Sequence, residues 1–234
     1  MLRTLSLLAV LALVVAACGG AADTADTTTT TAAPAETTAP AATETTEAPS
    51  DGEDAGDAAG AVTFVAGEGT QAGFEVEEVL RGDDVVVVAR NGSVDVEATI
   101  DFDDPAASEI AVVTIDAAGF VTDEDRRNNA IRQFILDVGD FPEITFAPSS
   151  FDGAADALSG GTGTITGDLT IRDVTVPVTF EVTATEASAN GITAEATATV
   201  DRTDWGLNIP SVPFVASVAD DVVLVLDLVL VPTG

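Results

Sequence analysis

The sequence has no histidine, no lysine and no tyrosine, and it has one cysteine and one tryptophan among 234 residues. With no imidazole and a single thiol, the chain can form no histidine base, no Cys/His zinc site and no internal disulfide. These absences remove most familiar hydrolytic chemistry, and we expect no enzymatic activity, no catalytic residue, no metal site and no cofactor. The apolar content of 46% is enough to build the core of one domain.

Positive charge is also scarce, because eight arginines face 40 acidic side chains and the formal net charge is −32. Nucleic-acid binding needs cations that displace counterions from phosphates. A chain this acidic is repelled by nucleic acids and by anionic lipid surfaces. We therefore expect no nucleic-acid partner.

The first 17 residues are typical of an export signal. Arg3 precedes an apolar run from residue 5 to residue 17. This run is too short for a membrane-spanning helix, which needs roughly 20 residues. The small residues before Cys18 resemble the lipobox of bacterial lipoproteins, in which the cysteine sulfur receives a diacylglyceryl group. The sequence thus predicts a signal peptide (1–17), lipid attachment at Cys18 and an extracytoplasmic protein anchored to the bacterial cell membrane by its acyl chains.

A low-complexity segment follows, and we assign residues 18–61 to the lipidated cysteine and a disordered linker. Residues 19–61 contain 14 Ala, 11 Thr and 9 acidic side chains, with no base and no aromatic residue. Such a composition cannot bury enough apolar surface to fold. As a flexible coil it would span roughly 35 to 40 Å. An alternative is that the run from Thr24 to Thr31 carries glycans.

From residue 62 to the end at 234, the pattern changes to alternation. Apolar side chains at 94, 96, 98 and 100 share one face of a strand while polar residues share the other, and the same holds from Ile192 to Val200. The expected strands lie at about 74–80, 85–90, 94–100, 110–117, 144–151, 164–171, 175–185, 192–200 and 222–231. Turn signals such as Asn190-Gly191 separate several of them. Short strands joined by tight turns predict an all-β antiparallel barrel or sandwich.

One segment has helical spacing instead. Thr122 and the acidic residues after it offer an N-terminal cap, and Ile131, Phe134 and Ile135 then fall on one helix face. We expect one short helix from about residue 123 to 136, whose apolar stripe closes one opening of the sheet.

The inward residues of one strand are unusually small. Ala194, Ala196 and Ala198 occupy successive inward positions. An eight-stranded barrel can hold one small ligand when some inward side chains are short. The row of alanines therefore favours a hollow interior with an occupant. The alternative is a solid core, filled by large residues from the opposite wall.

The last strand is apolar on both faces except at Asp227. Its outward valines, Val223, Val225, Val229 and Val231, would be the working surface of the alternative function, a structural or interaction module with a solid barrel. Such a surface would dock on an envelope protein or form a homodimer.

Four segments, taken in order, carry a family pattern. They are Asp123-Glu124-Asp125-Arg126-Arg127 through Phe141-Pro142-Glu143-Ile144-Thr145-Phe146, then Gly167-Asp168-Leu169-Thr170-Ile171-Arg172-Asp173-Val174-Thr175-Val176-Pro177-Val178, then Asp201-Arg202-Thr203-Asp204-Trp205-Gly206-Leu207, and Asp221-Val222-Val223-Leu224. Together they resemble the YceI family. The resemblance implies a lipocalin-like antiparallel β-barrel, here of about eight to nine strands, with a helical lid. It also implies an apolar channel for the isoprenoid tail of a quinone or polyprenyl compound.

The sequence departs from the family at two places. Many members have His-Gly where this chain has Arg172-Asp173, and an aromatic residue other than tryptophan is commoner at Trp205. Neither change disturbs an apolar channel, but the first could alter a polar contact near that turn.

The candidate ligand-binding residues are aromatic or small. The candidate channel lining comprises Phe134, Phe141, Phe146, Phe180, Ala194, Ala196, Ala198, Trp205 and Phe214. Arg126 and Arg127 are candidates for a ligand head group, because guanidinium forms bidentate contacts with pyrophosphate and donates to quinone oxygens. Their alternative role is pairing with neighbouring carboxylates. The leading hypothesis is thus a carrier or scavenger of an isoprenoid lipid.

Other charged motifs have simpler interpretations. The pairs Asp201 and Asp204, and Asp220 and Asp221, lack the spacing of a known metal loop, so we interpret them as solvated or capping groups. The Arg81-Gly82-Asp83 tripeptide lies at an expected turn, where glycine and aspartate are favoured.

Overall fold

The computed structural model describes residues 60–211, 213 and 215–234. The predicted signal peptide, the lipid-attachment residue Cys18, almost all of the predicted linker and Phe214 lie outside the described residues. None of the helices in the described part has the length and apolar character needed to cross a bilayer.

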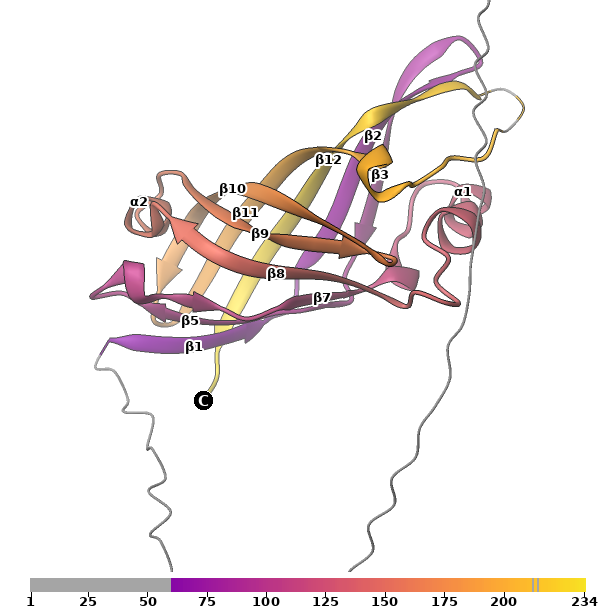
Figure 1. Cartoon of the computed structure of the whole chain (residues 1–234). Helices are drawn as coiled ribbons and strands as arrows, with labels where there is room; N and C mark the ends of the chain where they lie inside the picture. The colour runs from indigo at the N-terminus through magenta and orange to yellow at the C-terminus, as the bar shows by residue number, and fades with distance from the viewer. Residues whose placement is uncertain (1–59, 212, 214) are drawn as a thin grey trace, which may run out of the picture. The chain divides into compact units, whose positions relative to one another are not determined.

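The described residues form one antiparallel sheet of 12 strands, which is strongly curled (Figure 1). The strands are β1 (Ala61–Ala66), β2 (Gln71–Leu80), β3 (Asp83–Asn91), β4 (Val94–Asp95), β5 (Glu97–Asp101), β6 (Glu109–Ile110), β7 (Val113–Asp116), β8 (Glu143–Asp152), β9 (Gly163–Ile171), β10 (Val174–Ser188), β11 (Gly191–Asp201) and β12 (Val215–Pro232). The antiparallel barrel expected from the sequence is confirmed, with more strands than the eight or nine predicted.

The order of strands explains the curl. Neighbours run β4-β7-β8-β9-β10-β11-β12-β1-β5-β6, and β2 pairs with β12 and β3 off this path. Only Val96 separates β4 from β5 in the chain, so the two ends of the path are drawn together. The sheet branches at the long strand β12. Its first part pairs with β2, and its last three residues pair with β1.

The alternation predicted for the strands places the core inside this curl. Val96, Ala98 and Ile100 are buried on β5 and just before it, and Ile192, Ala194, Ala196 and Ala198 are buried on β11. These residues belong to one hydrophobic cluster with Phe64, Phe146 and Trp205. The outward residues of the same strands, such as Thr193 and Glu195, are exposed.

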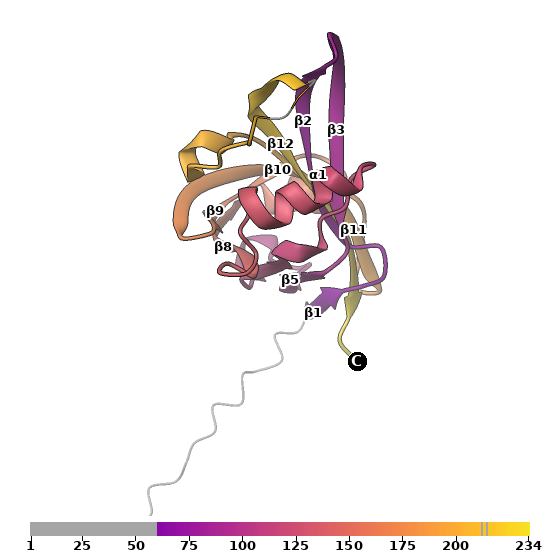
Figure 2. The same ribbon diagram turned by 90° about the vertical axis from the view of Figure 1, so that its right-hand side faces the viewer.

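The predicted helix is present but changes geometry in its middle. It begins as α1 (Asp125–Ala130) and continues as the π-helical turn η3 (Ile131–Ile135), in which the Leu136 amide donates to the carbonyl of Ile131. The side chain of Glu124 caps the first turn, where the sequence suggested Thr122. Thr122 instead donates its hydroxyl to the buried amide of Asn128 at 2.7 Å. Figure 2 shows α1 lying across one end of the curled sheet.

The prediction of a single helix is incomplete, because a second helix, α2 (Ala154–Leu158), joins β8 to β9. Gly153 precedes it with a φ of 70°, a left-handed conformation that glycine adopts without strain and that turns the chain out of the strand. Three short 3₁₀ segments complete the fold: η1 (Pro105–Ala107), η2 (Ala117–Gly119) and η4 (Arg202–Trp205). Two further differences are β1, which the sequence did not indicate, and the start of β12 at residue 215 rather than 222.

Candidate ligand cavity

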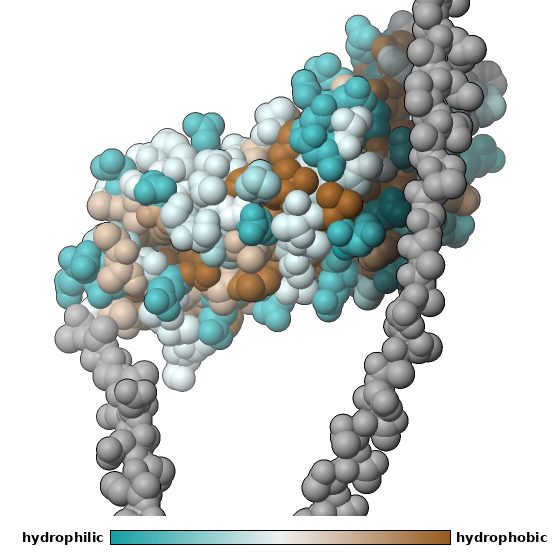
Figure 3. All heavy atoms as spheres, in the orientation of Figure 1, coloured by the Kyte–Doolittle hydropathy of each residue, from teal (hydrophilic) through white to brown (hydrophobic). Residues whose placement is uncertain are grey.

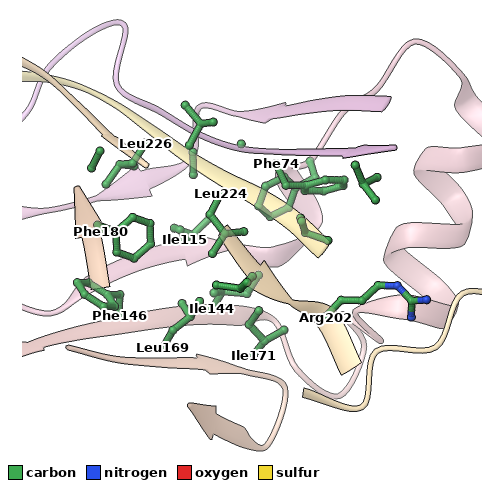
Figure 4. Close-up of a pocket in the computed structure, with 18 of the residues that line it drawn as sticks. Phe74, Ile115, Ile144, Phe146, Leu169, Ile171, Phe180, Arg202, Leu224 and Leu226 are labelled. Carbon is green, nitrogen blue, oxygen red and sulfur yellow. The ribbon is translucent and has the colours of Figure 1, made fainter. Parts of the chain in front are cut away.

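The curled sheet encloses a cavity of about 740 Å³. Its walls are apolar side chains from strands on all sides, including Phe74, Ile144, Leu169, Leu224 and Leu226, whose side chains converge on the interior in Figure 4. The solid-core alternative is therefore wrong for the described residues. A dry void of this size would cost about 18 kcal/mol at ~24 cal/mol per Å³, which exceeds the whole stability of a typical domain. The cavity must therefore hold water or a ligand.

Small residues create much of this space. Ala194 and Ala196 border the cavity from β11, and Ala194 lies opposite Ala184 of β10 in the ladder. On the other side of β11, the partners in β12 are the larger Leu228 and Leu226. Ala194 and Ala196 thus leave space in the interior that longer side chains would fill.

The length of the cavity follows from β12, whose regular run of bordering residues extends from Val222 to Leu230, with Val215 and Val218 bordering it further along the strand. At ~3.4 Å per residue this stretch corresponds to about 27 Å. The cavity is therefore a long channel, suited in shape to an extended hydrocarbon chain.

Aromatic residues shape the walls at two levels. The rings of Phe146 and Phe180 meet edge to face, with centroids 5.1 Å apart, and both border the cavity. Gly167 makes room for this pair, because a Cβ atom there would come within 2.7 Å of the Phe146 ring. Trp205 is 2% exposed, and its Nε1 donates to the carbonyl oxygen of Leu169 at 3.1 Å. This bond fixes η4 against β9, so the indole forms a rigid part of the wall.

Charged residues gather at the end of the channel that α1 crosses, which we call the mouth. It is bordered by Glu78, Arg81, Asp123, Glu124, Arg126, Arg127 and Arg202. Arg202 points toward the α1 end in Figure 4. Figure 3 shows hydrophobic residues at the surface beside the loop that follows η4, so apolar side chains also reach this end.

An ion pair fastens α1 at the mouth. The guanidinium of Arg127 donates to the buried carboxylate of Glu78 on β2 at 3.0 Å, and it also pairs with Asp123. Arg202 is held by Asp220 and by two backbone carbonyls, those of Leu207 and Ala219. The charges of Arg127 and Arg202 are thus largely neutralised by these carboxylates.

Arg126 differs from the other mouth arginines. It is exposed, and its side chain has no hydrogen-bond or ion-pair partner among the described residues. It is therefore available to a polar group at the mouth.

The sequence-predicted residues are only partly brought together. Those that border the cavity are Phe146, Phe180, Ala194, Ala196, Trp205, Arg126 and Arg127. The pairing expected as the alternative for the arginines is also found at Arg127, with Asp123.

Three predicted lining residues do not border the cavity. Phe134 is 64% exposed, because the π turn rotates it away from the face that carries Ile131 and Ile135. Phe141 lies under the guanidinium of Arg172, 5.4 Å from its ring centroid. Ala198 is buried opposite Leu224 on the inward face of β11, but it is not among the residues that border the cavity.

Sequence reasoning missed the leucines of β12. In this strand the leucines at 224, 226, 228 and 230 all border the cavity, whereas the valines at 223, 229 and 231 do not, and Val223 and Val231 are exposed. The strand was described as apolar on both faces, but this division by residue size was a usable signal. Phe74 and Glu78 of β2 were also missed, because no motif marks them.

The charged motifs set aside at first are structural in the described residues. The carboxylate of Asp201 caps η4 and accepts from the hydroxyl and the amide of Thr203, at 2.6 and 2.8 Å. These bonds lower the pKa of Asp201 below its ordinary value of 3.8. Arg81 and Gly82 form the two-residue turn between β2 and β3, with φ angles of 57° and 96°.

Comparison with solved structures places this architecture among known ones. BcnA of Burkholderia cenocepacia superimposes with a TM-score of 0.56 and 20% identity, over 68% of this chain and 95% of its own. A polyisoprenoid binding domain from Saccharophagus degradans gives a TM-score of 0.55 with 14% identity, over 74% and 99%. The YceI protein of Campylobacter jejuni gives 0.52 with 18% identity, over 62% and 84%. No curated protein matches the sequence significantly.

The sequence itself supplies the family assignment. The family model of the YceI-like domain matches residues 64–230, a range that includes every residue that borders the cavity. The chain therefore belongs to the YceI-like domain family.

Proposed function

We propose that this protein binds the isoprenoid tail of a quinone or polyprenyl compound in its channel and acts as a carrier or scavenger of that lipid. The observation that carries the proposal is the cavity of about 740 Å³, which is long and is lined by apolar side chains except at its mouth. A relative of the same fold is described as a polyisoprenoid binding domain. No catalytic step is part of the proposal.

The energetics of the cavity agree with a hydrocarbon occupant. A tail that buries ~300 Å² of apolar surface gains roughly 7 kcal/mol before association costs. Water in the same channel would find few hydrogen-bond partners, since the polar residues lie at the mouth. An apolar ligand therefore displaces water at little polar cost.

The head group of the lipid would remain at the mouth. Arg126 is exposed there and free of partners among the described residues. It can donate to a quinone oxygen or a phosphate without breaking the bond between Glu78 and Arg127. The tail would then extend toward α2.

The location of the protein belongs to the same proposal. The apolar segment 5–17 and the small residues before Cys18 support export and lipidation, which would hold the domain at the outer surface of the cell membrane through a linker. Replacing Cys18 with Ser should release the protein from the membrane fraction. Retention of the Cys18→Ser protein on membranes would contradict anchoring at this residue.

Lipid binding is tested by extraction of the protein purified from its own host. We expect mass spectrometry of the organic extract to show an isoprenoid compound in molar proportion to the protein. The matched variants are Ala196→Leu, which places bulk in the channel, and Ala198→Leu, which places the same bulk in the packed core of the same strand.

The two variants should behave differently. Ala196→Leu should reduce the bound lipid several-fold with little loss of stability, because the added side chain fills open space. Ala198→Leu should keep the lipid but destabilise the fold by about 1 to 3 kcal/mol through overpacking. An extract without isoprenoid compounds, or equal lipid content in the wild type and Ala196→Leu, would overturn the proposal.

A further inference from the structure

Glu78 is a charged residue in an otherwise apolar row that faces the channel. Every second residue of β2 from 74 to 80 borders the cavity, and the residues between them do not. The other members of this row are Phe74, Val76 and Leu80. Within it, the side chain of Glu78 is only 7% exposed. A carboxylate in such a place needs polar partners, because a buried charge without them is strongly unfavourable.

One oxygen of this carboxylate has a partner in the protein and the other has none. Oε1 accepts from the guanidinium of Arg127 at 3.0 Å, which is the one hydrogen bond of the Glu78 side chain within the described residues. Oε2 is not sealed inside the protein either, because the only fully buried side-chain nitrogen or oxygen without a partner in the described part is Nε of Arg172. Oε2 therefore meets open space. Since Glu78 borders the cavity at the mouth, that space is the entrance of the channel.

The chemistry of this oxygen restricts what can lie beside it. An ionised carboxylate accepts hydrogen bonds and donates none. Quinone carbonyls, ethers and ionised diphosphates also have no donor, so their oxygens would meet Oε2 with charge of the same sign. A hydroxyl group differs because it both donates and accepts. It can donate to Glu78, and a head group that carries it can still accept from Arg126, which borders the same mouth.

We propose that Glu78 selects lipids whose head group carries a hydroxyl donor, such as prenyl alcohols and hydroquinones, over quinones and prenyl diphosphates. This inference rests on the proposed function and chooses among the head groups that it leaves open. The ligand hydroxyl donates to Oε2 in a charge-assisted bond, which is stronger than a bond between neutral groups. Arg127 holds Oε1 and so positions the carboxylate. A head group that displaces water from Oε2 without donating to it loses affinity.

Competition between two matched probes tests this selectivity. The probes are geranylgeraniol and its methyl ether, which share one tail and differ in the hydroxyl donor. Phosphatidylcholine vesicles offer both in equal amounts and in excess to the full chain carrying Cys18→Ser, so that the protein can be separated from the vesicles. Mass spectrometry of the extracted protein then gives the ratio of bound probes. We expect at least about tenfold more alcohol than ether.

Glu78→Gln should abolish the preference while keeping the contact with Arg127. The guanidinium needs an acceptor, so the amide oxygen should face Arg127 and the amide NH₂ should face the channel. Both probes have an oxygen that accepts from this NH₂, and the bound ratio should therefore fall to about one. The matched control is Glu77→Gln, which makes the same charge change at the next residue of β2. Glu77 is exposed and does not border the cavity, so this variant should keep the original ratio.

The possible results separate this inference from the proposed function. Selection by Glu78 would be overturned, with lipid binding intact, by equal binding of alcohol and ether, by a preference that survives Glu78→Gln, or by an equal loss of preference in Glu77→Gln. Stronger binding of geranylgeranyl diphosphate than of the alcohol would also overturn it. Binding of none of the probes would overturn both proposals. The first comparison keeps Glu78 in place, so it does not depend on the folding of a variant, and circular dichroism checks the fold of Glu78→Gln.

Discussion

The two ends of the channel differ in what borders them. At the end opposite the mouth, α2 contributes Ala157 and Leu158, and Ala157 is 1% exposed. At the mouth, the border includes seven charged side chains and the short helix α1. One end is thus closed by close packing of small apolar groups, and the other by polar contacts that can exchange with water. Because packing is costly to undo and exposed ion pairs are weak, we expect ligands to enter at the mouth.

The contrast between apolar packing and polar contacts is strongest near the mouth. There Trp205 is part of the closely packed wall. Trp205→Ala should destabilise the domain by about 3 to 5 kcal/mol, because it removes a large buried side chain and leaves the carbonyl of Leu169 without its donor. Chemical denaturation monitored by circular dichroism measures this loss. Trp205→Phe keeps most of the bulk and should cost much less. Equal losses for the two variants would show that the hydrogen bond, and not the packing, holds η4.

Loss of the ion pair that joins α1 to β2 should reduce the stability of the domain less than Trp205→Ala does. Arg127→Leu leaves the carboxylate of Glu78, which is 7% exposed, without its partner. Because Arg127 is 22% exposed and water can reach the pair, we expect a loss of about 1 to 3 kcal/mol, less than for a fully buried pair.

Two variants serve as controls for the ion pair between Glu78 and Arg127. The double variant Glu78→Leu/Arg127→Leu should recover most of the lost stability, because it leaves no buried charge. Asp123→Ala removes the exposed partner of Arg127 and should change stability by less than about 0.5 kcal/mol. Failure of the double variant to recover stability would mean that Glu78 has another role at the mouth.

The closed end should determine the length of tail that fits. Ala194 borders the channel opposite Ala184 of β10, close to the segment that follows α2. Ala194→Phe should weaken binding of the longest prenyl chains at least about tenfold, since each methylene excluded from an apolar site costs ~0.8 kcal/mol. Short chains, which do not reach this end, should bind as before.

Fluorescence of Trp205, the single tryptophan, measures this binding during titration with prenyl alcohols of increasing length. Arg126→Ala at the mouth is the matched variant and should affect alcohols of all lengths equally. A uniform loss of affinity in Ala194→Phe would contradict the assignment of this end as the channel floor.

Much of the fold could be predicted from the sequence because the alternation of apolar and polar residues is regular in the long strands. β5, β9 and β11 were located in this way, and the inward alanines at 194 and 196 do border the cavity. The short strands β4 and β6 are two residues each, and periodicity did not separate β4 from β5, which the sequence merged into one expected strand at 94–100. The sequence placed the start of β2 at residue 74, although the strand begins three residues earlier at Gln71, because Gly73 interrupts the alternation.

The candidate site was harder to predict because a lining position depends on where a side chain points in space. Phe134 has the correct helical spacing, yet a π turn rotates it into solvent. Ala198 has the correct strand period, but the core closes over it. Glu78 is an acidic residue in a run of acidic residues, and only the position of α1 brings Arg127 to it. These outcomes depend on tertiary contacts, which a local pattern does not contain.

The smallest expected effect concerns the cap of η4 at the mouth. Thr203 donates two hydrogen bonds to the Asp201 carboxylate and lowers its pKa in the folded state. A group with a lowered folded pKa stabilises the fold at pH values above its unfolded pKa, here 3.8, and loses this contribution as the pH falls through the lower folded pKa.

Thr203→Ala should therefore reduce stability slightly at neutral pH, and the difference from the wild type should shrink at acidic pH. Thermal denaturation of both proteins over a pH series measures this difference, with Thr199→Ala on the exposed face of β11 as the control. A difference between wild type and Thr203→Ala that grew toward acid would contradict the cap, because protonation of Asp201 removes the acceptor that Thr203 serves.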